Sequence, residues 1–511
     1  MEAARTRTAT IIGVEGHLVE VEADVSHGLP STVLIGLPDT ALREARDRVR
    51  AAIVNSDERW PDAKITVSLL PATLPKRGSA YDLAIAVAVL AANGDLAAIP
   101  EETAFLAELG LDGRLRPVHG VLPAALAVAR DGITTIVVAA ANEAEADQVP
   151  GMTVVGAESL AEVVAWLRGG PPPHAEPPSG GDGGGSAPSR PQPDLTEVFG
   201  QPDARRALEV CAAGGHNLSL LGPAGSGKVM LAERLPSILP PLDPAAALEV
   251  TSIHSVAGAL PPGAGLVTHP PFRAPHHTAS MAAVIGGGSG LIRPGAASLA
   301  HRGVLFLDQA PEFHADVLAA LRQPLESGEV IIARAGTQAV FPARFILVLA
   351  AGPCPCAKSA GPDSADCSCS PAARRRYLAR LSGPLLDRID VKARLQPNSR
   401  SGMLSGNKSA ESSSVVAQRV AAARERAAAR LAGTTWRLNS EVPGTVLRRS
   451  FPPGTSALTI LDRAVALGQL SARGADAAVR VAWSLADLRG TDRPGSGEVN
   501  QAIALRTGAV R

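Results

Sequence analysis

A glycine-rich turn between an apolar strand and a helix restricts the fold of this chain more than any other segment. The apolar run Leu218–Leu221 leads into Gly222-Pro-Ala-Gly-Ser-Gly-Lys228, after which a helical pattern begins. This order is that of a P-loop, whose backbone amides surround phosphate groups while its lysine reaches the terminal phosphates. A glycine-rich turn without a nucleotide is the alternative, which the spacing and the flanks disfavour. The residues expected to contact the nucleotide are Gly222, Pro223, Ala224, Gly225, Ser226, Gly227, Lys228 and Val229.

A second segment carries the carboxylate that such a site needs. The apolar run Val304–Leu307 predicts a buried strand that ends at Asp308. A carboxylate at this place, the Walker B position, binds magnesium beside the nucleotide. The alternative is an aspartate that only caps a turn after the strand. We therefore predict ATP and Mg²⁺ as cofactors, with Asp308 as the protein ligand of the magnesium ion.

The composition fits a globular protein of two or three domains. The chain has 511 residues, of which 46% are hydrophobic and only 3% aromatic, so alanine, valine and leucine must build most of the cores. Lys+Arg and Asp+Glu both number 49, which gives a formal net charge of zero. This balance argues against a histone-like polycation, although a neutral protein can contain a local basic channel for nucleic acid.

The sequence carries no recognisable membrane or export signal. No apolar run approaches the roughly 18 residues of a membrane span, and the N-terminal residues lack an apolar segment followed by a cleavage site. We therefore expect a cytoplasmic protein with reduced cysteines and no membrane partner.

Two polar stretches divide the chain. Gly169–Pro193 consists largely of glycine, proline and serine and offers few side chains to bury, which predicts a flexible tether. Asn398–Ser414 is a second candidate for a mobile connection. The predicted domains are residues 1–168, the tether 169–193, a nucleotide-binding domain 194–397 and a helical domain 398–511. Periodic patterns predict a hairpin over 8–25, helices over 41–56 and 81–93, a strand over 65–71, a hairpin and strand over 329–350, and helices over 413–433 and within 458–488.

The motifs of nearly the whole chain, in their order, resemble those of the YifB/ComM family of magnesium-chelatase-like AAA+ ATPases. The resemblance rests on GHNLSLLGPAGSGK, FRAPHHTAS, IGGGSGLIRPG, SLAHRGVLFLD, LRQPLESGEV, PCPC and SGPLLDRID, with LIGLPDTALREARDRVRAAIVNS and TTWRLNSEVPG nearer the two ends. It implies an α/β protein with a Lon-protease-like α+β N-terminal domain, a P-loop AAA+ α/β core and a C-terminal helical lid. It also implies a homo-oligomeric ring, a hexamer, that drives DNA branch migration with ATP during natural transformation.

Three residues depart from the pattern of that family around the reacting phosphate. Val229 stands where a P-loop has Ser or Thr, whose hydroxyl ligates magnesium. Gln309 stands where the family has the glutamate that polarises the attacking water, and an amide cannot accept a proton at neutral pH. Gly352 stands where the family has a sensor asparagine. Because each replacement looks sterically mild, we expect nucleotide binding to persist and hydrolysis to be impaired.

The resemblance also implies roles for three arginines. Arg388, in LLDRID, resembles the arginine that reaches the γ-phosphate of a neighbouring subunit, with a surface ion pair as the alternative. Arg473, in LSARG, lies where a lid-domain sensor arginine can lie, while Trp483 replaces a later arginine of the family. Arg334 lies near the tip of the second predicted hairpin and resembles a channel-facing DNA contact, with a solvated arginine as the alternative.

The cysteines suggest a metal site. Four reduced thiolates in one short loop can hold a tetrahedral zinc ion, although the C-x-C spacing is less typical than C-x-x-C. Cys211 lies on a predicted helix and is expected to be a buried apolar residue. The pair His276-His277 has no third ligand nearby in the sequence, which favours a structural or subunit-contact role. The candidate zinc ligands are Cys354, Cys356, Cys367 and Cys369.

The Lon-like resemblance does not extend to protease chemistry. Lon-type proteases use a serine and a lysine, with the serine in a PSAG turn. The matching turn here, PKRGSAYDL, has Ala80 at the place of the serine and Ser79 one position away. The later segment GRLRPVHGVLPAALAV offers no lysine at the expected place. We therefore do not expect proteolysis.

Function classes of different kinds remain open at this point. The first is an ATP-binding AAA+ ring protein that acts on branched or single-stranded DNA with slow or absent hydrolysis. The second is a non-catalytic regulatory or structural subunit that assembles with an active AAA+ partner. A magnesium-chelatase subunit is a third, and the Lon-like domain ahead of the AAA+ core argues against it.

Overall fold

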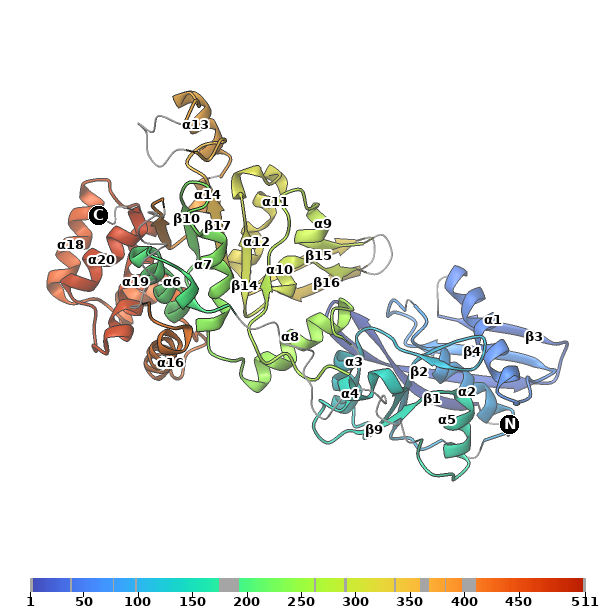
Figure 1. Cartoon of the computed structure of the whole chain (residues 1–511). Helices are drawn as coiled ribbons and strands as arrows, with labels where there is room; N and C mark the ends of the chain where they lie inside the picture. Colours follow the sequence, from blue (N-terminus) through green and yellow to red (C-terminus); the bar gives the residue numbers. More distant parts are fainter. Residues whose placement is uncertain are drawn as a thin grey trace.

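The computed structural model contains two large β-sheets, which lie in separate parts of the molecule (Figure 1). The N-terminal sheet and the C-terminal helices lie at opposite ends, with the central sheet between them (Figure 1). This mixed α/β architecture with parallel strands confirms the coarse fold class. The structure describes residues 3–36, 39–76, 78–96, 99–173, 193–261, 263–288, 292–334, 337–358, 367–381, 383–397 and 410–508.

The N-terminal sheet contains the segment 8–25, in which apolar and polar residues alternate. Val19, Val21 and Ala23 are fully buried on one face, so this segment forms the predicted antiparallel hairpin. The seven strands have the order β3-β4-β2-β1-β5-β8-β9. The β1, β2 and β4 strands pair antiparallel, and the other neighbours pair parallel. The strands are β1 (Ala4–Ile12), β2 (Glu15–Ser26), β3 (Ser31–Ile35), β4 (Lys64–Leu70), β5 (Thr103–Leu106), β8 (Thr135–Ala139) and β9 (Thr153–Ala157), with the small hairpin β6 (Glu108–Leu109) and β7 (Leu115–Arg116).

Helices cover both faces of this sheet and form two hydrophobic cores. The first core lies under α1, α2 and α5, and α2 is buried almost all round because nearly all of its residues are apolar. The second core lies under α3 on the other face. The predicted helices over 41–56 and 81–93 and the strand over 65–71 are thus confirmed. The helices are α1 (Asp39–Asn55), α2 (Asp82–Ala92), α3 (Val121–Arg130), α4 (Glu143–Ala146) and α5 (Leu160–Leu167).

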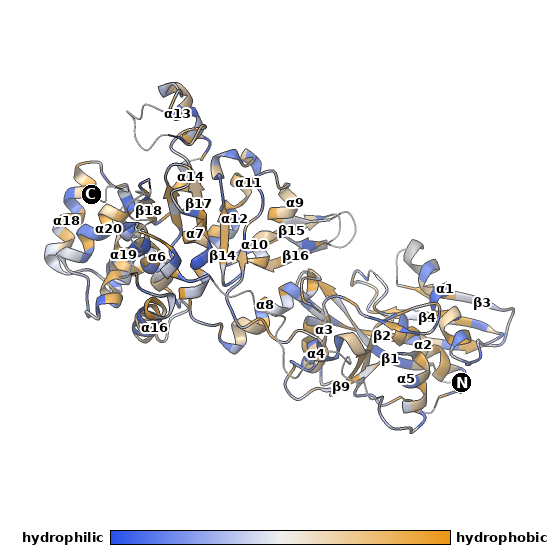
Figure 2. Cartoon of the chain, in the orientation of Figure 1, coloured by the Kyte–Doolittle hydropathy of each residue, from blue (hydrophilic) through white to orange (hydrophobic). Residues whose placement is uncertain are grey.

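The central sheet consists of five parallel strands in the order β11-β14-β17-β10-β18. Figure 2 shows hydrophobic residues along its inner strands. All six residues of β17 are buried, as expected for a central parallel strand covered on both faces. The strands are β10 (Leu218–Leu221), β11 (Phe272–Arg273), β14 (Val304–Leu307), β17 (Ile346–Ala351) and β18 (Val391–Arg394).

Helices and two hairpins surround the central sheet. The predicted second hairpin is confirmed as β15 paired antiparallel with β16, and both strands contribute to the core on one face of the sheet. The hairpins are β12 (Gly286–Gly287) with β13 (Arg293–Pro294), and β15 (Glu329–Arg334) with β16 (Thr337–Pro342). The helices are α6 (Pro202–Gly214), α7 (Lys228–Arg234), α8 (Pro244–Val256), α9 (Met281–Val284), α10 (Ala296–Leu299), α11 (Ala315–Ala320), α12 (Arg322–Ser327), α13 (Pro371–Ala379) and α14 (Gly383–Leu386).

The C-terminal helices share one continuous hydrophobic core with the other face of the central sheet. Buried polar contacts fix this packing, because His216 contacts Asp390 at 3.1 Å and Ser484 of α19 at 2.7 Å. The helices predicted over 413–433 and within 458–488 are confirmed, and α17 and α20 accompany them. The helices are α16 (Ser413–Arg430), α17 (Gly444–Ser450), α18 (Thr455–Ala466), α19 (Ala472–Arg489) and α20 (Ser496–Thr507).

Helix α8 joins the two parts of the molecule. It packs on α3 of the N-terminal part, and the Ser255 hydroxyl is hydrogen bonded to Glu145. The predicted tether falls largely on residues 174–192, and the second polar stretch on 398–409, which lie outside the described residues. Ser413 and Ser414 already belong to α16, so the second stretch ends earlier than predicted. Among the described helices, none is long and apolar enough to cross a membrane.

Candidate nucleotide-binding site

The residues of the predicted nucleotide site meet at one edge of the central sheet. Gly222, Asp308 and Gly352 each follow directly on a parallel strand, namely β10, β14 and β17. The strands are in register, because Leu221 pairs with Ala351 and Leu307 pairs with Leu349. The carboxyl ends of parallel strands form the usual ligand-binding edge of an open α/β sheet. The two sequence motifs and the third altered position are therefore brought together.

Glycines shape the turn between β10 and α7. Gly225 and Gly227 have φ angles of 72° and 89°, which a residue with a side chain adopts only with strain. At Gly222 an added Cβ would lie 2.9 Å from the Leu395 Cβ and 2.8 Å from the Ser226 hydroxyl, so only glycine fits. The Ser226 hydroxyl donates to the Pro223 carbonyl at 2.9 Å. The turn thus has the backbone conformation of a phosphate cradle.

Lys228 lies at the end of this turn, and its ammonium contacts the turn itself. Its ammonium donates to the carbonyl oxygens of Gly222 at 2.8 Å and Pro223 at 2.7 Å. Partial burial lowers the pKa of Lys228, and the charge of Asp308 opposes this shift. Lys228, after β10, and Asp308, after β14, follow strands on either side of β17 and so lie at the same edge of the sheet.

Two of the altered residues are exposed beside this pair. Val229, in the first turn of α7, has 40% of its surface exposed, which is unusual for valine. Gln309 is exposed and adopts the left-handed conformation, with φ 51° and ψ 44°. Non-glycine residues in this conformation gather at functional sites. Both residues are exposed and follow directly on Lys228 and Asp308 in the chain, so Thr and Glu can replace them without repacking a core.

The third altered residue is more restricted than expected. An added Cβ at Gly352 would lie 3.0 Å from the Ala357 Cβ and 3.1 Å from the Cys354 carbonyl oxygen. Ala357 itself has a φ of 53°, a conformation that favours glycine. An asparagine at this position therefore requires Ala357 to shift by a few tenths of an ångström, and whether the replacement is sterically mild stays a prediction.

The residues on either side of the cysteine-rich segment, after β17 and around α13, contact both halves of this edge. The Ala224 amide in the P-loop donates to the Ala357 carbonyl at 2.8 Å. On the Walker B side, Arg380, directly after α13, contacts Glu312 at 2.9 Å. Burial raises the pKa of the Tyr377 phenol of α13, and the Gly352 backbone, which lies near it, opposes this shift to a smaller extent. The structure thus adds the contacts of Ala357, Tyr377 and Arg380 to the site. No motif in the sequence indicates these contacts.

Of the three predicted arginines, Arg388 lies apart from this edge, and Arg473 and Arg334 are exposed. Arg388 precedes β18 and lies at the opposite, amino edge of the sheet, where it is paired with Glu326. Arg473 is exposed in the first turn of α19. Arg334 is exposed at the end of β15, where it pairs with Thr337. Arg388 therefore does not act on the P-loop of its own chain.

The other residues considered from the sequence have simple environments. Cys211 is fully buried in the core of the central sheet, as predicted. The ring centroids of His276 and His277 lie 4.1 Å apart with the planes tilted by 36°, and His276 contacts Thr278 at 2.8 Å. Trp483 is buried, with its indole N–H donating to the Phe451 carbonyl and Arg430 over its ring. These contacts assign Trp483 to the core.

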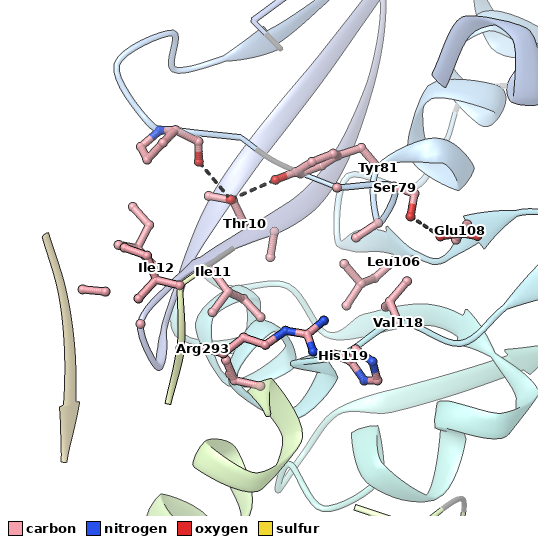
Figure 3. A pocket seen from close by; sticks show the side chains of 18 of the residues that line it. Thr10, Ile11, Ile12, Ser79, Tyr81, Leu106, Glu108, Val118, His119 and Arg293 are labelled. Carbon is pink, nitrogen blue, oxygen red and sulfur yellow. Dashed lines mark hydrogen bonds between the residues drawn. The ribbon is translucent and has the colours of Figure 1, made fainter. Parts of the chain in front are cut away.

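A cavity of about 310 Å³ lies between the N-terminal part and the β15–β16 hairpin. Arg334 lines it, and Figure 3 shows Arg293 extending toward His119. The Ser79 hydroxyl is hydrogen bonded to Glu108. No lysine is among the described residues that line the cavity, and the nearby Lys76 donates to backbone carbonyls instead. This arrangement does not supply the serine–lysine pair of a Lon-type protease.

Gln201 joins the edge although no motif pointed to it. Its side chain donates to the Gln396 carbonyl at 2.6 Å and accepts from the Gln396 amide at 3.1 Å. It also lies 3.4 Å from the Ser226 carbonyl of the P-loop. The only sequence signal was Pro202, which marks the start of α6. Such a signal locates the helix and gives no indication of the contact with the P-loop.

Comparison with known proteins places the chain among full-length relatives. Family models match residues 194–403 (magnesium chelatase, subunit ChlI), 21–142 (subunit ChlI of Mg-chelatase) and 410–506 (subunit ChlI, C-terminal). An uncharacterized protein of Mycobacterium tuberculosis is 51% identical over 518 residues, covering 100% of both chains. The YifB protein of Escherichia coli is 40% identical, covering 99% of this chain and 97% of its own. Competence protein ComM of Haemophilus influenzae is 39% identical, covering 97% and 96%. A shorter similarity, 26% identity over 163 residues, links 30% of the chain to 21% of Lon protease 1 of Bacillus subtilis.

Proposed function

The chain belongs to the YifB/ComM family of magnesium-chelatase-like AAA+ proteins, and from this premise we propose that it binds ATP, forms a ring and acts on DNA with slow or absent hydrolysis. In this proposal residues 1–168 form a Lon-like domain without protease activity, and 169–193 form the tether. Residues 194–397 form the nucleotide-binding domain, and 398–511 form the helical lid. The short similarity to Lon proteases supports the first assignment.

One observation carries the proposal, namely the contrast within the carboxyl edge of the central sheet. The proposed phosphate-binding half has a turn whose positive φ angles suit glycine, together with Lys228, whose charge interacts with that of Asp308. The half that positions magnesium and the attacking water has Val229, Gln309 and Gly352 in place of three polar groups. A site built in this way favours binding over turnover.

Each residue at this edge has a separate proposed role in binding ATP and magnesium. The backbone amides of the P-loop and Lys228 bind the phosphates of ATP, whose γ-phosphoryl group supplies the reacting bond. Asp308 offers one carboxylate, which suits magnesium because that ion keeps several waters and takes further oxygens from the phosphates. Val229 offers no oxygen, which should weaken magnesium affinity. Gln309 can hold a water by hydrogen bonds and cannot take its proton.

The location of Arg388 supports action between subunits. It lies at the sheet edge opposite the P-loop of its own chain, where its ion pair with Glu326 is partly exposed. In a ring, such an arginine can reach the nucleotide of the next subunit. Arg334 on the β15–β16 hairpin remains the proposed DNA contact, and the name of the competence protein ComM supports a role with DNA.

The experiment that tests this function measures assembly and DNA binding together. Light scattering should show a shift of the protein to a ring, a hexamer, when a slowly hydrolysed ATP analogue and Mg²⁺ are added. The ring should then bind a labelled four-way DNA junction, and Arg334→Ala should weaken that binding at low salt. A protein that binds the analogue yet stays monomeric and binds no DNA would contradict the proposal.

The same substitutions also support the second candidate, a non-catalytic subunit of a mixed AAA+ ring. A partner with intact hydrolysis residues would then supply turnover, and this chain would supply bound nucleotide and Arg388. Co-purification with an active AAA+ protein, together with failure to form a ring alone, would favour this candidate over the first.

A further inference from the structure

Four cysteine sulfur atoms lie together beside the nucleotide edge. The Sγ atoms of Cys354, Cys356, Cys367 and Cys369 all lie within 4.8 Å of one another. The Cys354 sulfur is 3.3 Å from that of Cys356 and 3.5 Å from that of Cys367. A tetrahedron with zinc–sulfur bonds of about 2.3 Å has sulfur–sulfur edges of about 3.8 Å, so these spacings suit one ion. A disulfide needs about 2.0 Å, and all five cysteines are free.

The four cysteines come from two separate segments of the chain. Cys354 and Cys356 follow β17, and Cys367 and Cys369 precede α13. Within the described part of the chain, no other group of three or more metal-type side chains is found. Thiolate sets select zinc, copper(I) or iron–sulfur clusters, and sulfur atoms this close leave room for a single ion rather than a cluster. With four protein ligands no position stays open for substrate, which is the mark of a structural zinc.

We propose that these four thiolates bind one structural zinc ion, which links the residues after β17 to the residues before α13 beside the nucleotide edge. Ala357 lies directly after the first cysteine pair, and its carbonyl accepts the Ala224 amide of the P-loop at 2.8 Å. After the second pair, α13 brings Tyr377 to the Gly352 backbone and is followed by Arg380, which contacts Glu312. An ion that joins the two pairs therefore holds the P-loop side and the Walker B side together.

Zinc binding stands on the cysteine geometry alone, while its effect on the P-loop rests on the proposed nucleotide binding. Loss of the ion should free Ala357 and weaken its hydrogen bond to Ala224. One such hydrogen bond corresponds to a roughly threefold to tenfold change in an equilibrium constant. We therefore expect zinc removal to weaken binding of an ATP analogue by about this factor.

Elemental analysis of the full-length protein, purified without added metal or chelator, tests the site. About one zinc per chain is expected. Cys354→Ser and Cys367→Ser should each lose it, whereas Cys211→Ala, a control far from the cluster in the core, should retain it. Iron in place of zinc, or equal zinc in all four proteins, would overturn the proposal.

Thiol alkylation keeps the test decisive if the serine variants do not fold. In the unmodified protein, the four clustered cysteines should react slowly with an alkylating reagent until a chelator is added, with release of zinc to a chromogenic indicator. Fast reaction without chelator, or reaction only after a reductant, would instead show free thiols or disulfides and overturn the site.

The nucleotide measurement then separates the two parts of the proposal. A fluorescent ATP analogue is titrated into the zinc-loaded protein and into the protein after chelation. Equal affinity in both would overturn the link to the P-loop and leave the zinc site intact. Zinc-loaded protein that binds no analogue would overturn the proposed function instead, since the ion is then present and the nucleotide is not bound.

Discussion

The two halves of the carboxyl edge of the central sheet differ in a way that neither strand order nor core packing explains. Around β10 the turn proposed to bind phosphate has glycines at its positive-φ positions and carries Lys228. The strands β14 and β17 are equally buried. However, Gln309 stands where the family has a carboxylate, and Gly352 stands where it has the amide of an asparagine. The fold and the proposed phosphate-binding turn are thus intact where the residues expected for turnover are replaced.

This difference also shows how a site changes without losing its scaffold. Val229 and Gln309 are exposed, so their replacement alters no core packing. Gly352 is buried and close to Ala357, so its replacement is coupled to a neighbour. Exposed catalytic groups can be exchanged one at a time, while buried ones change together with the residues around them.

The largest expected effect comes from restoring the hydrolysis half. Val229→Thr, Gln309→Glu and Gly352→Asn, combined with Ala357→Gly to make room, should raise the ATPase rate by about 100-fold or more, because one positioned group alone can be worth a hundredfold. Each single reversion should give much less, since the groups act as a unit. Steady-state phosphate release measures this. A combined variant no faster than the best single one would show that the lost groups do not explain the rate.

A smaller effect is expected from damaging the phosphate-binding half. Lys228→Ala should weaken binding of an ATP analogue about 10- to 100-fold, the range expected for losing hydrogen bonds from a charged group. Lys64→Ala, an exposed lysine of the N-terminal sheet, serves as the matched control and should bind normally. Isothermal titration calorimetry measures both. Equal affinity in the two variants would contradict the assignment of the phosphate cradle.

The smallest expected effect concerns the buried contact at Gly352. Gly352→Asn alone should lower the free energy of unfolding by about 1–2 kcal/mol through overpacking against Ala357. Adding Ala357→Gly should recover most of this loss, because glycine removes the Cβ and tolerates the positive φ. Chemical denaturation of the two variants and the parent measures the coupling. Additive effects of the two changes would show that these residues are not in contact.

Much of the fold could be predicted from sequence because its elements have strong periods. The hairpin over 8–25, the apolar α2 and the helix beginning at Ser413 all follow from alternation or helical spacing. The order of strands in the central sheet did not follow, since parallel neighbours are far apart in the chain. That order is what brings Asp308 and Gly352 to the P-loop.

The sequence motifs predicted which residues line the candidate site. They did not predict the residues that contact this edge from other segments. Glycine spacing and a strand-ending aspartate identify Lys228 and Asp308 because their chemistry demands those residue types. Gln201 reaches the edge through its side-chain amide and Ala357 through its backbone carbonyl, and both contacts join segments that are far apart in the chain. Nothing in a single sequence marks such contacts. The crowding at Gly352 was missed for the same reason, because it depends on the conformation of a residue five positions away.

Hydrolysis by the unmodified protein is the most direct test of the central claim that this chain binds ATP without turning it over efficiently. The protein is mixed in excess with radiolabelled ATP and Mg²⁺, with and without a four-way DNA junction, and bound nucleotide and released phosphate are followed in the same samples. We predict that ATP binds and remains largely intact under both conditions, and that Lys228→Ala abolishes the retained label. Rapid release of phosphate by the unmodified protein, lost in Lys228→Ala, would contradict the claim and identify an ordinary ATP-driven motor.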